Sequence, residues 1–194
     1  MCPMRGGMHE IEVKLPFESA AAARERVERL GARLARPRHF EDNLVLDRGH
    51  DRLVAAGVLL RLRRAGGRAV LTLKLPVGGD HRHKVREEHE TAVDDADAAL
   101  EILRGLGFST VYRYQKHRTV FRLGDLTLCL DETPIGCFLE LEGSPDEIDG
   151  AAARLGFAPE QYVRENYREL QERAARERGV EASDMLIEAG GELP

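Results

Sequence analysis

The 194-residue sequence contains no tryptophan, and aromatic residues make up only 5% of it. Its three cysteines, Cys2, Cys129 and Cys137, are odd in number and include no C-x-x-C pair, which argues against a disulfide framework and a cysteine zinc site. No apolar run approaches the ~20 residues of a transmembrane helix, and the first residues lack the apolar core of a signal peptide. The sequence therefore predicts a cytoplasmic protein without a membrane partner, in which Cys129 and Cys137 are buried packing residues.

An excess of positive charge is also lacking, because the formal net charge is −5 although 32% of the residues are charged. Nucleic acids and anionic membranes attract positively charged surfaces, so we do not expect nucleic acid as a partner. A hydrophobic content of 42% is sufficient for one well-buried domain in a chain of this length. We expect this single domain at residues 8–178, between a disordered leader at 1–7 and a mobile tail at 179–194.

Alternation of polar and apolar residues with a period of two predicts a chain built mainly of strands. Segments with this pattern lie at residues 9–15, 40–47, 58–64, 69–75, 85–93, 112–123, 126–131 and 138–141. Helical patterns lie at 20–30, 94–106, 144–155 and 159–178. The segment 78–83 has the composition of an exposed loop, in which we expect His81 and His83 to be solvated. The fold class predicted is α+β.

One face of nearly every predicted strand carries charged side chains. They are Glu10, Glu12, Lys14, Arg61, Arg63, Lys74, Arg86, Glu88, Glu90, Lys116, Arg118, Asp131, Glu140 and Glu142, seven basic and seven acidic. The opposite faces are apolar, and amphipathic helices can cover them. Such a polar face is ordinarily a solvated surface. Because it carries so many charges and so few Ser, Thr or Gln, we favour a binding surface, which lines a tunnel if the sheet closes.

The two signs of charge together indicate the ligand. Arg and Lys side chains match phosphate oxygens, and clustered carboxylates recruit Mg²⁺ or Mn²⁺, which in turn bridge phosphates. The pattern therefore predicts a polyanion bound together with divalent metal ions.

The segment Glu10-Ile11-Glu12-Val13-Lys14 resembles the E-x-E-x-K signature of the CYTH superfamily, the triphosphate tunnel metalloenzymes. The family's other charged elements follow in the same order, in LLRLR, LTLK, VREEHE, YQKHR, LCLDE and FLELEG, and the resemblance runs from about residue 8 to about residue 170. It implies an eight-stranded antiparallel β-barrel, a tunnel with a charged interior and helices packed outside, and dependence on divalent metal. Two departures concern Leu44-Val45-Leu46-Asp47, where the family often has an aromatic-Phe-Asp strand, and Asn166-Tyr167, where it has a Ser-Tyr pair.

Roles follow from the chemistry of each side chain. Six cations form the expected phosphate cradle: Arg61, Arg63, Lys74, Arg86, Lys116 and Arg118. Lys14 and Glu12 are the candidate catalytic residues. Seven carboxylates are candidate metal ligands: Glu10, Glu12, Glu88, Glu90, Asp131, Glu140 and Glu142. Each of these residues has an alternative role in a structural ion pair.

Three functions remain open at this point. The chain is either a metal-dependent hydrolase of inorganic, thiamine or nucleoside triphosphate, a class IV adenylate cyclase that makes cyclic AMP and pyrophosphate from ATP, or a non-catalytic module that binds polyphosphate or nucleotide. Among aromatic residues near the charged positions, only Tyr114 and Phe138 have inward parity, which favours a substrate that is nearly all phosphate. The sequence leaves open whether the protein is a monomer or a homodimer.

Overall fold

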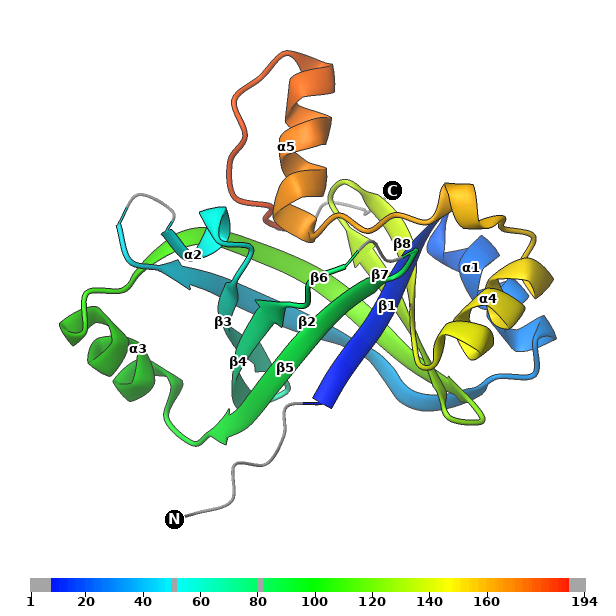
Figure 1. Ribbon diagram of the computed structural model, residues 1–194, viewed down its shortest axis with the longest axis horizontal. Helices are drawn as coiled ribbons and strands as arrows, with labels where there is room; N and C mark the ends of the chain where they lie inside the picture. The colour runs from blue at the N-terminus through cyan, green and yellow to red at the C-terminus, as the bar shows by residue number, and fades with distance from the viewer. Residues whose placement is uncertain (1–7, 50–51, 80–81, 189–194) are drawn as a thin grey trace.

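The computed structural model describes residues 8–49, 52–79 and 82–188. This part of the chain forms a closed antiparallel barrel in the order β1-β5-β4-β3-β2-β6-β7-β8, with β8 paired back to β1 (Figure 1). The strands are β1 (Met8–Phe17), β2 (Arg33–Asp47), β3 (Leu59–Ala65), β4 (Arg68–Pro76), β5 (Lys84–Val93), β6 (Ser109–Leu123), β7 (Leu126–Thr133) and β8 (Gly136–Glu142). The predicted eight-stranded barrel is confirmed, and the leader predicted at 1–7 lies outside the described residues.

The β3–β4 hairpin turns at Gly66 and Gly67, which both adopt positive φ values, of 58° and 75°. A two-residue turn with two positive φ angles matches the right-handed twist of the strands that it joins, and glycine adopts such angles without strain. The turn fixes the register from Ala65 opposite Arg68 to Leu59 opposite Lys74. Arg61, Arg63 and Lys74 consequently point to the same side of the hairpin.

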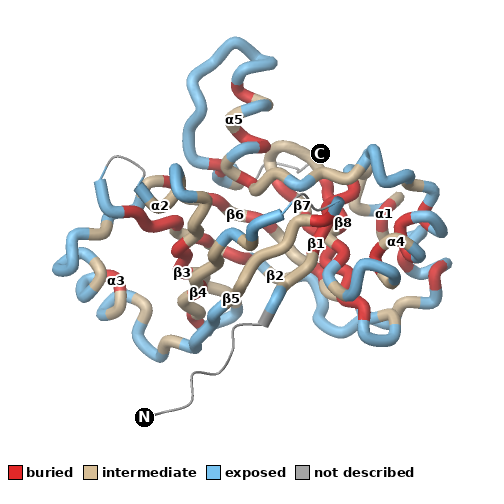
Figure 2. Tube along the Cα trace, in the orientation of Figure 1, coloured by how far each residue is buried: buried red, intermediate tan, exposed pale blue. Residues whose placement is uncertain are grey.

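Helices α1 (Ala20–Arg29) and α4 (Pro145–Arg154) pack on the outer face of β1, β7 and β8. The side chains buried there include Val13, Leu15, Leu128, Leu139 and Ile148. Figure 2 shows this concentration of buried residues. Each fully buried leucine contributes roughly 1.5–3 kcal/mol relative to an exposed one. The outer core thus stabilises the part of the barrel that carries Glu12 and Lys14 on its inner face.

Helix α3 (Ala96–Gly105) lies at the opposite side of the barrel and buries Leu100 in a second outer cluster with Leu62 and Ala69 (Figure 1). The short helix α2 (Arg52–Ala55) was not predicted. It begins where the buried Asp47 carboxylate accepts hydrogen bonds from the Leu53 and Val54 amides at 3.0 Å. No helix in the described ranges has the length and apolar character needed to cross a membrane.

Strand β2 begins at Arg33, seven residues before the predicted start at Phe40. The added segment is exposed and lacks alternation, and its register with β6 shifts between Arg36 and His39, on either side of Pro37. Proline has no N–H to donate, so it is tolerated in a strand at such an irregularity.

The single helix predicted at 159–178 is wrong. A 3₁₀ turn (Pro159–Gln161) and helix α5 (Tyr167–Arg178) are separated by an extended segment. There, Val163 exchanges two backbone hydrogen bonds with Lys14, of 3.0 and 2.9 Å. Because the N–H and C=O groups of Val163 are hydrogen-bonded to Lys14, they need no partners within a helix, and β1 holds this backbone extended.

Part of the segment predicted to be a mobile tail packs against the barrel. Met185 is 1% exposed, donates from its amide to the Arg113 carbonyl at 3.0 Å, and accepts from the Gln115 amide at 2.8 Å. Strand β7 pairs with β6 only from His117 onward, so the first half of β6 leaves an edge on that side. The segment around Met185 occupies this edge, and α5 stands beside it (Figure 1).

Candidate functional site

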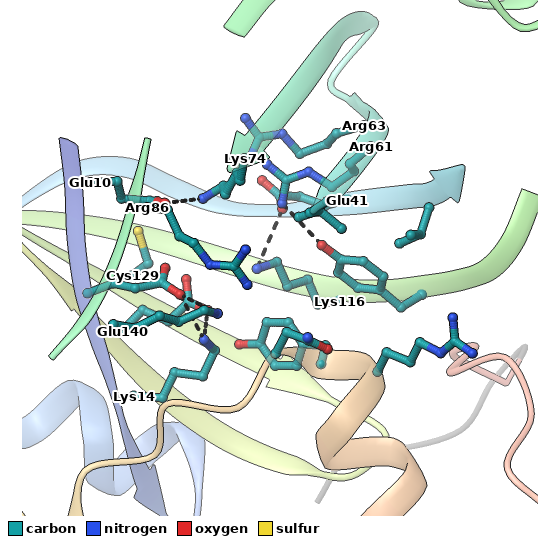
Figure 3. Close-up of a pocket in the computed structure, with 18 of the residues that line it drawn as sticks. Glu10, Lys14, Glu41, Arg61, Arg63, Lys74, Arg86, Lys116, Cys129 and Glu140 are labelled. Carbon is teal, nitrogen blue, oxygen red and sulfur yellow. Dashed lines mark hydrogen bonds and ion pairs between the residues drawn. The ribbon is translucent and has the colours of Figure 1, made fainter. Parts of the chain in front are cut away.

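A cavity of about 480 Å³ runs inside the barrel. All of the predicted inward charged residues except Asp131 line it, together with side chains from the start of α5. Figure 3 shows cations of β3, β4 and β5, including Arg61, Arg63, Lys74 and Arg86, facing Lys14 and Glu140 across this space. The side chains that alternation predicted to share one face therefore do face the interior of the barrel. Their chemical roles remain predictions.

Asp131 lies beneath the cavity surface and is fully buried. Its carboxylate accepts hydrogen bonds from Lys116 Nζ at 2.7 Å, from Arg118 Nε and Nη2 at 2.6 and 2.5 Å, and from the Tyr167 hydroxyl at 2.6 Å. Both oxygens are occupied, so this geometry does not support the prediction that Asp131 is a metal ligand. It instead fixes Lys116 and Arg118 in place and connects them to α5.

Lys14 lies between two carboxylates, with Nζ 3.3 Å from Glu12 Oε1 and 3.4 Å from Glu140 Oε1. Burial by itself would lower the pKa of Lys14, but Glu12 and Glu140 outweigh burial and raise that pKa above its ordinary value. Lys14 is therefore firmly protonated. This suits a contact with phosphate and does not suit acceptance of a proton.

Lys84 is a lining residue that the sequence analysis missed. Its Nζ lies 2.9 Å from Glu12 Oε1, on the same oxygen that Lys14 contacts. Burial, with repulsion from Lys14 and Arg86, lowers the pKa of Lys84 despite the attraction of Glu12. A signal was available, because Lys84 shares the parity of Arg86 and lies one residue before the predicted start of that strand.

Glu41 is a second lining residue that was missed, although it lies inside the strand predicted at 40–47. Burial would raise its pKa, but Arg118 and Lys116 lower it to about 2, so the carboxylate is ionised. Glu41 alternates with Phe40 and Leu44 along β2, which is the signal that could have identified it. Arg36 and His39, from the part of β2 that was not predicted, also line the cavity.

The arginines of β3 and β5 that line the cavity, Arg61, Arg63 and Arg86, are less completely neutralised than the cations near Asp131. Arg61 and Arg63 share one carboxylate, that of Glu90, at 3.7 and 3.5 Å, and Arg61 also donates to the Tyr114 hydroxyl at 3.1 Å. Among the described residues, no carboxylate lies within ion-pair distance of Arg86, which donates to the Gly57 carbonyl. These guanidinium groups retain N–H donors for an anionic ligand.

Two of the lining carboxylates, Glu88 of β5 and Glu142 of β8, are in the opposite situation. Burial raises the pKa of Glu88 to about 7, and repulsion from Glu10 and Glu90 adds to this against the effect of Lys74. Burial and repulsion from Glu10 likewise raise the pKa of Glu142. Negative charge at Glu88 and Glu142 is therefore incompletely compensated by the protein itself.

A divalent cation would compensate it. In the described parts of the chain, no three His, Cys, Asp or Glu side chains converge as a preformed metal site. Mg²⁺, however, usually keeps several waters and takes only one or two protein carboxylates beside substrate phosphates. The oxygen donors of Glu10, Glu88 and Glu142 fit such a hydrated ion in their chemistry.

Apolar and aromatic side chains line the cavity near Tyr167 of α5, although Arg168, Glu169 and Glu172 of the same helix also line it. Tyr112 lines it in addition to Tyr114, with which it stacks at a centroid distance of 5.8 Å, and Val45, Val58 and Leu59 complete this apolar surface. The expectation that only Tyr114 and Phe138 face inward is thus corrected. Phe138 is buried edge-on against Tyr167 and is not among the lining residues.

Cys129 and Cys137 are both buried, but only Cys137 belongs to the outer core. Cys129 faces the cavity. Burial raises the pKa of its thiol to about 12, so it is neutral and not an activated nucleophile.

Comparisons with known proteins agree with this architecture. Residues 8–157 match the family model of the CYTH domain. A protein of Methanocaldococcus jannaschii, named as a candidate adenylate cyclase, is 27% identical over 84% of this chain and 99% of its own length. A solved structure of a candidate adenylate cyclase from Vibrio parahaemolyticus superposes with a TM-score of 0.72 at 19% identity, over 84% of this chain and 98% of that one.

A third similar protein bears on the activity. The solved structure of a candidate adenylyl cyclase from Hippeastrum, reported to have a dominant triphosphatase activity, superposes with a TM-score of 0.58 at 22% identity. The match covers 89% of this chain and 96% of that one. Since the family model spans most of the sequence and the closed barrel carries the family's charged interior, the chain is a member of the CYTH domain family.

Proposed function

We propose that this protein is a divalent-metal-dependent triphosphatase, which hydrolyses inorganic, thiamine or nucleoside triphosphate inside the barrel. The observation that carries the proposal is one cavity in which guanidinium groups that keep N–H donors lie together with carboxylates whose charge the protein compensates incompletely. An anion that arrives with its own divalent cation satisfies both kinds of group at once.

In this proposal the cations of β3, β4 and β5 hold the phosphates. Arg61, Arg63 and Arg86 present guanidinium donors that fit phosphate oxygens in pairs. Because these groups are already fixed in the barrel wall, they stabilise the charge of the transition state without reorganisation. Lys116 and Arg118, held by Asp131, extend the same cradle on β6.

Glu10, Glu88 and Glu142 would hold the metal, with Glu12 and Glu140 close by. Mg²⁺ or Mn²⁺ bound there would offset phosphate charge and lower the pKa of a bound water. Glu12 positions two lysines through one carboxylate oxygen. Of these, Lys84 has the lowered pKa and is better suited to exchange a proton with the attacking water, whereas Lys14 is suited to remain charged beside a phosphate.

Cyclisation of ATP is the second candidate function. The apolar surface formed by Val45, Val58, Leu59 and Tyr112 offers a place for a base, and all three relatives described above are named for this activity. A cyclase must also align the ribose 3′-hydroxyl with the α-phosphorus. We rank hydrolysis first because charged side chains dominate the lining.

Product analysis tests the proposal. The protein is incubated with Mn²⁺ or Mg²⁺ and, separately, with inorganic triphosphate, thiamine triphosphate and ATP, and a Glu12→Gln variant serves as the inactive control. We expect inorganic and thiamine triphosphate to be turned over faster than ATP, with little cyclic AMP. Cyclic AMP and pyrophosphate as the main products would establish the cyclase instead, and tight binding without turnover of any substrate would indicate a non-catalytic module.

A further inference from the structure

A partly buried polar cluster lies outside the cavity, where the start of β5, the middle of α4 and the connection from α4 to α5 meet. It consists of His83, Asp149 and Tyr162, with Arg82 at its edge. His83 was expected to be solvated, but it is only 8% exposed, and its Nε2 lies 2.8 Å from Asp149 Oδ1. The Tyr162 hydroxyl donates to the same oxygen at 3.0 Å, and Arg82 donates to Oδ2 at 3.0 Å.

Asp149 therefore accepts from three groups that belong to two other segments of the chain. Interaction with His83 and Tyr162 outweighs burial and lowers the pKa of Asp149, so the carboxylate is ionised. The His83 and Tyr162 rings lie 6.0 Å apart, and the Tyr162 ring also packs against the outer core. The cluster is thus a fixed junction between the barrel and its outer helices.

Each of the two joined segments continues directly into the cavity. His83 precedes Lys84, which contacts Glu12. Tyr162 precedes Val163, whose backbone exchanges both hydrogen bonds with Lys14. The same connection leads to Asn166, which caps α5, and to Tyr167, whose hydroxyl donates to Asp131.

From this geometry we infer that Asp149, with His83 and Tyr162, is a positioning residue, which fixes Lys14 and Lys84 against the Glu12 carboxylate. The inference rests on the proposed function for its kinetic consequence only. A displacement of about 1 Å in a catalytic constellation can reduce the rate roughly 100-fold. Side chains that never touch substrate can therefore control turnover.

The test uses the full chain with two substitutions of graded severity. Asp149→Ala removes both acceptor oxygens, and Tyr162→Phe removes one hydroxyl while the ring stays packed. Glu165→Gln is the matched control. Glu165 lies in the same connection as Tyr162, but it pairs with Arg173 of α5 and takes no part in the cluster. Triphosphate turnover is measured well below the midpoint of thermal unfolding, so that the folded fraction is complete.

We expect kcat/KM to fall about 10- to 100-fold for Asp149→Ala and severalfold for Tyr162→Phe, mainly through kcat. The control should stay within about twofold. Restoring an acceptor with Asp149→Asn should recover part of the loss. Kinetic constants within about twofold of the parent for both Asp149→Ala and Tyr162→Phe would overturn the inference.

Amide hydrogen exchange supplies a readout that does not depend on any reaction. Exchange at Lys14 and Val163 should accelerate in Tyr162→Phe, while exchange in the β3–β4 hairpin stays as in the parent. Acceleration spread evenly over the barrel would mean that the cluster is merely stabilising, and would contradict the inference. If the parent turns over no triphosphate, the proposed function fails, yet the local exchange result still decides whether the cluster positions Lys14.

Discussion

The substitution Asp131→Asn separates a structural role of this carboxylate from metal binding. Asparagine keeps the shape of the side chain and one acceptor oxygen, but it removes the negative charge shared by Lys116 and Arg118. It also turns an N–H₂ group toward one of these donors. Two cations would then lie against a fully buried neutral group, with Glu41 and Glu140 as their remaining carboxylate neighbours.

Breaking a buried ion pair by removing one partner typically costs about 3–5 kcal/mol, because the other charge stays buried. At roughly 2–4 °C per kcal/mol for a domain of about 150–250 residues, the midpoint of thermal unfolding should fall by about 6–20 °C. Asp97→Asn is the control, since it breaks a pair with Arg64 in which the Asp97 side chain is 87% exposed. Such surface pairs contribute about 1 kcal/mol or less.

Urea unfolding measures the loss of free energy and thermal unfolding measures the fall of the midpoint, both followed by far-UV circular dichroism in EDTA and again in Mg²⁺. If Asp131 has a structural role, the whole loss of about 3–5 kcal/mol should be seen in EDTA. A metal-ligating Asp131 predicts no loss in EDTA and a loss only of the extra stability that Mg²⁺ confers. If Asp131→Asn unfolds in EDTA within about 1 kcal/mol of the parent, the argument from burial and hydrogen bonding is wrong.

Three further predictions concern the cavity. Arg61→Ala and Arg63→Ala should each lower kcat/KM for a triphosphate, by an amount that corresponds to a loss of about 2–4 kcal/mol of transition-state stabilisation. Values of kcat/KM close to the parent's in both variants would exclude phosphate contacts from β3. EDTA should abolish turnover, and added Mg²⁺ or Mn²⁺ should restore it; full activity in excess chelator would exclude a metal role. Glu88 has a folded-state pKa raised to about 7, so it retains a proton that the unfolded chain releases, and its contribution to stability decreases as the pH rises from about 4.5 to about 7. Glu88→Gln should therefore unfold at a higher temperature than the parent at pH 8 in EDTA, with the difference vanishing near pH 4, and equal midpoints at pH 8 would refute the uncompensated charge.

Strand identity and the facing of side chains could be predicted from the sequence, because both follow from the period of two. Glu10, Glu12 and Lys14 had to share a face whatever β1 pairs with. Glu41 was overlooked inside a predicted strand, and the other omissions occurred where the local pattern is weak. The exposed start of β2 around Pro37 shows no alternation, so Arg36 and His39 were missed, and a strand limit drawn one residue late excluded Lys84.

Other features depend on contacts between residues that are distant in the chain, and alternation carries no information about them. Lys14 lies opposite Glu140 because β1 closes on β8, and Val163 is extended because its backbone pairs with Lys14. The burial of Asp131 likewise depends on Tyr167 of α5. The sequence by itself determined which charges face one side of the sheet. Only the tertiary structure decided which of them are neutralised by a partner and which remain available to a ligand, because that depends on distances across the barrel.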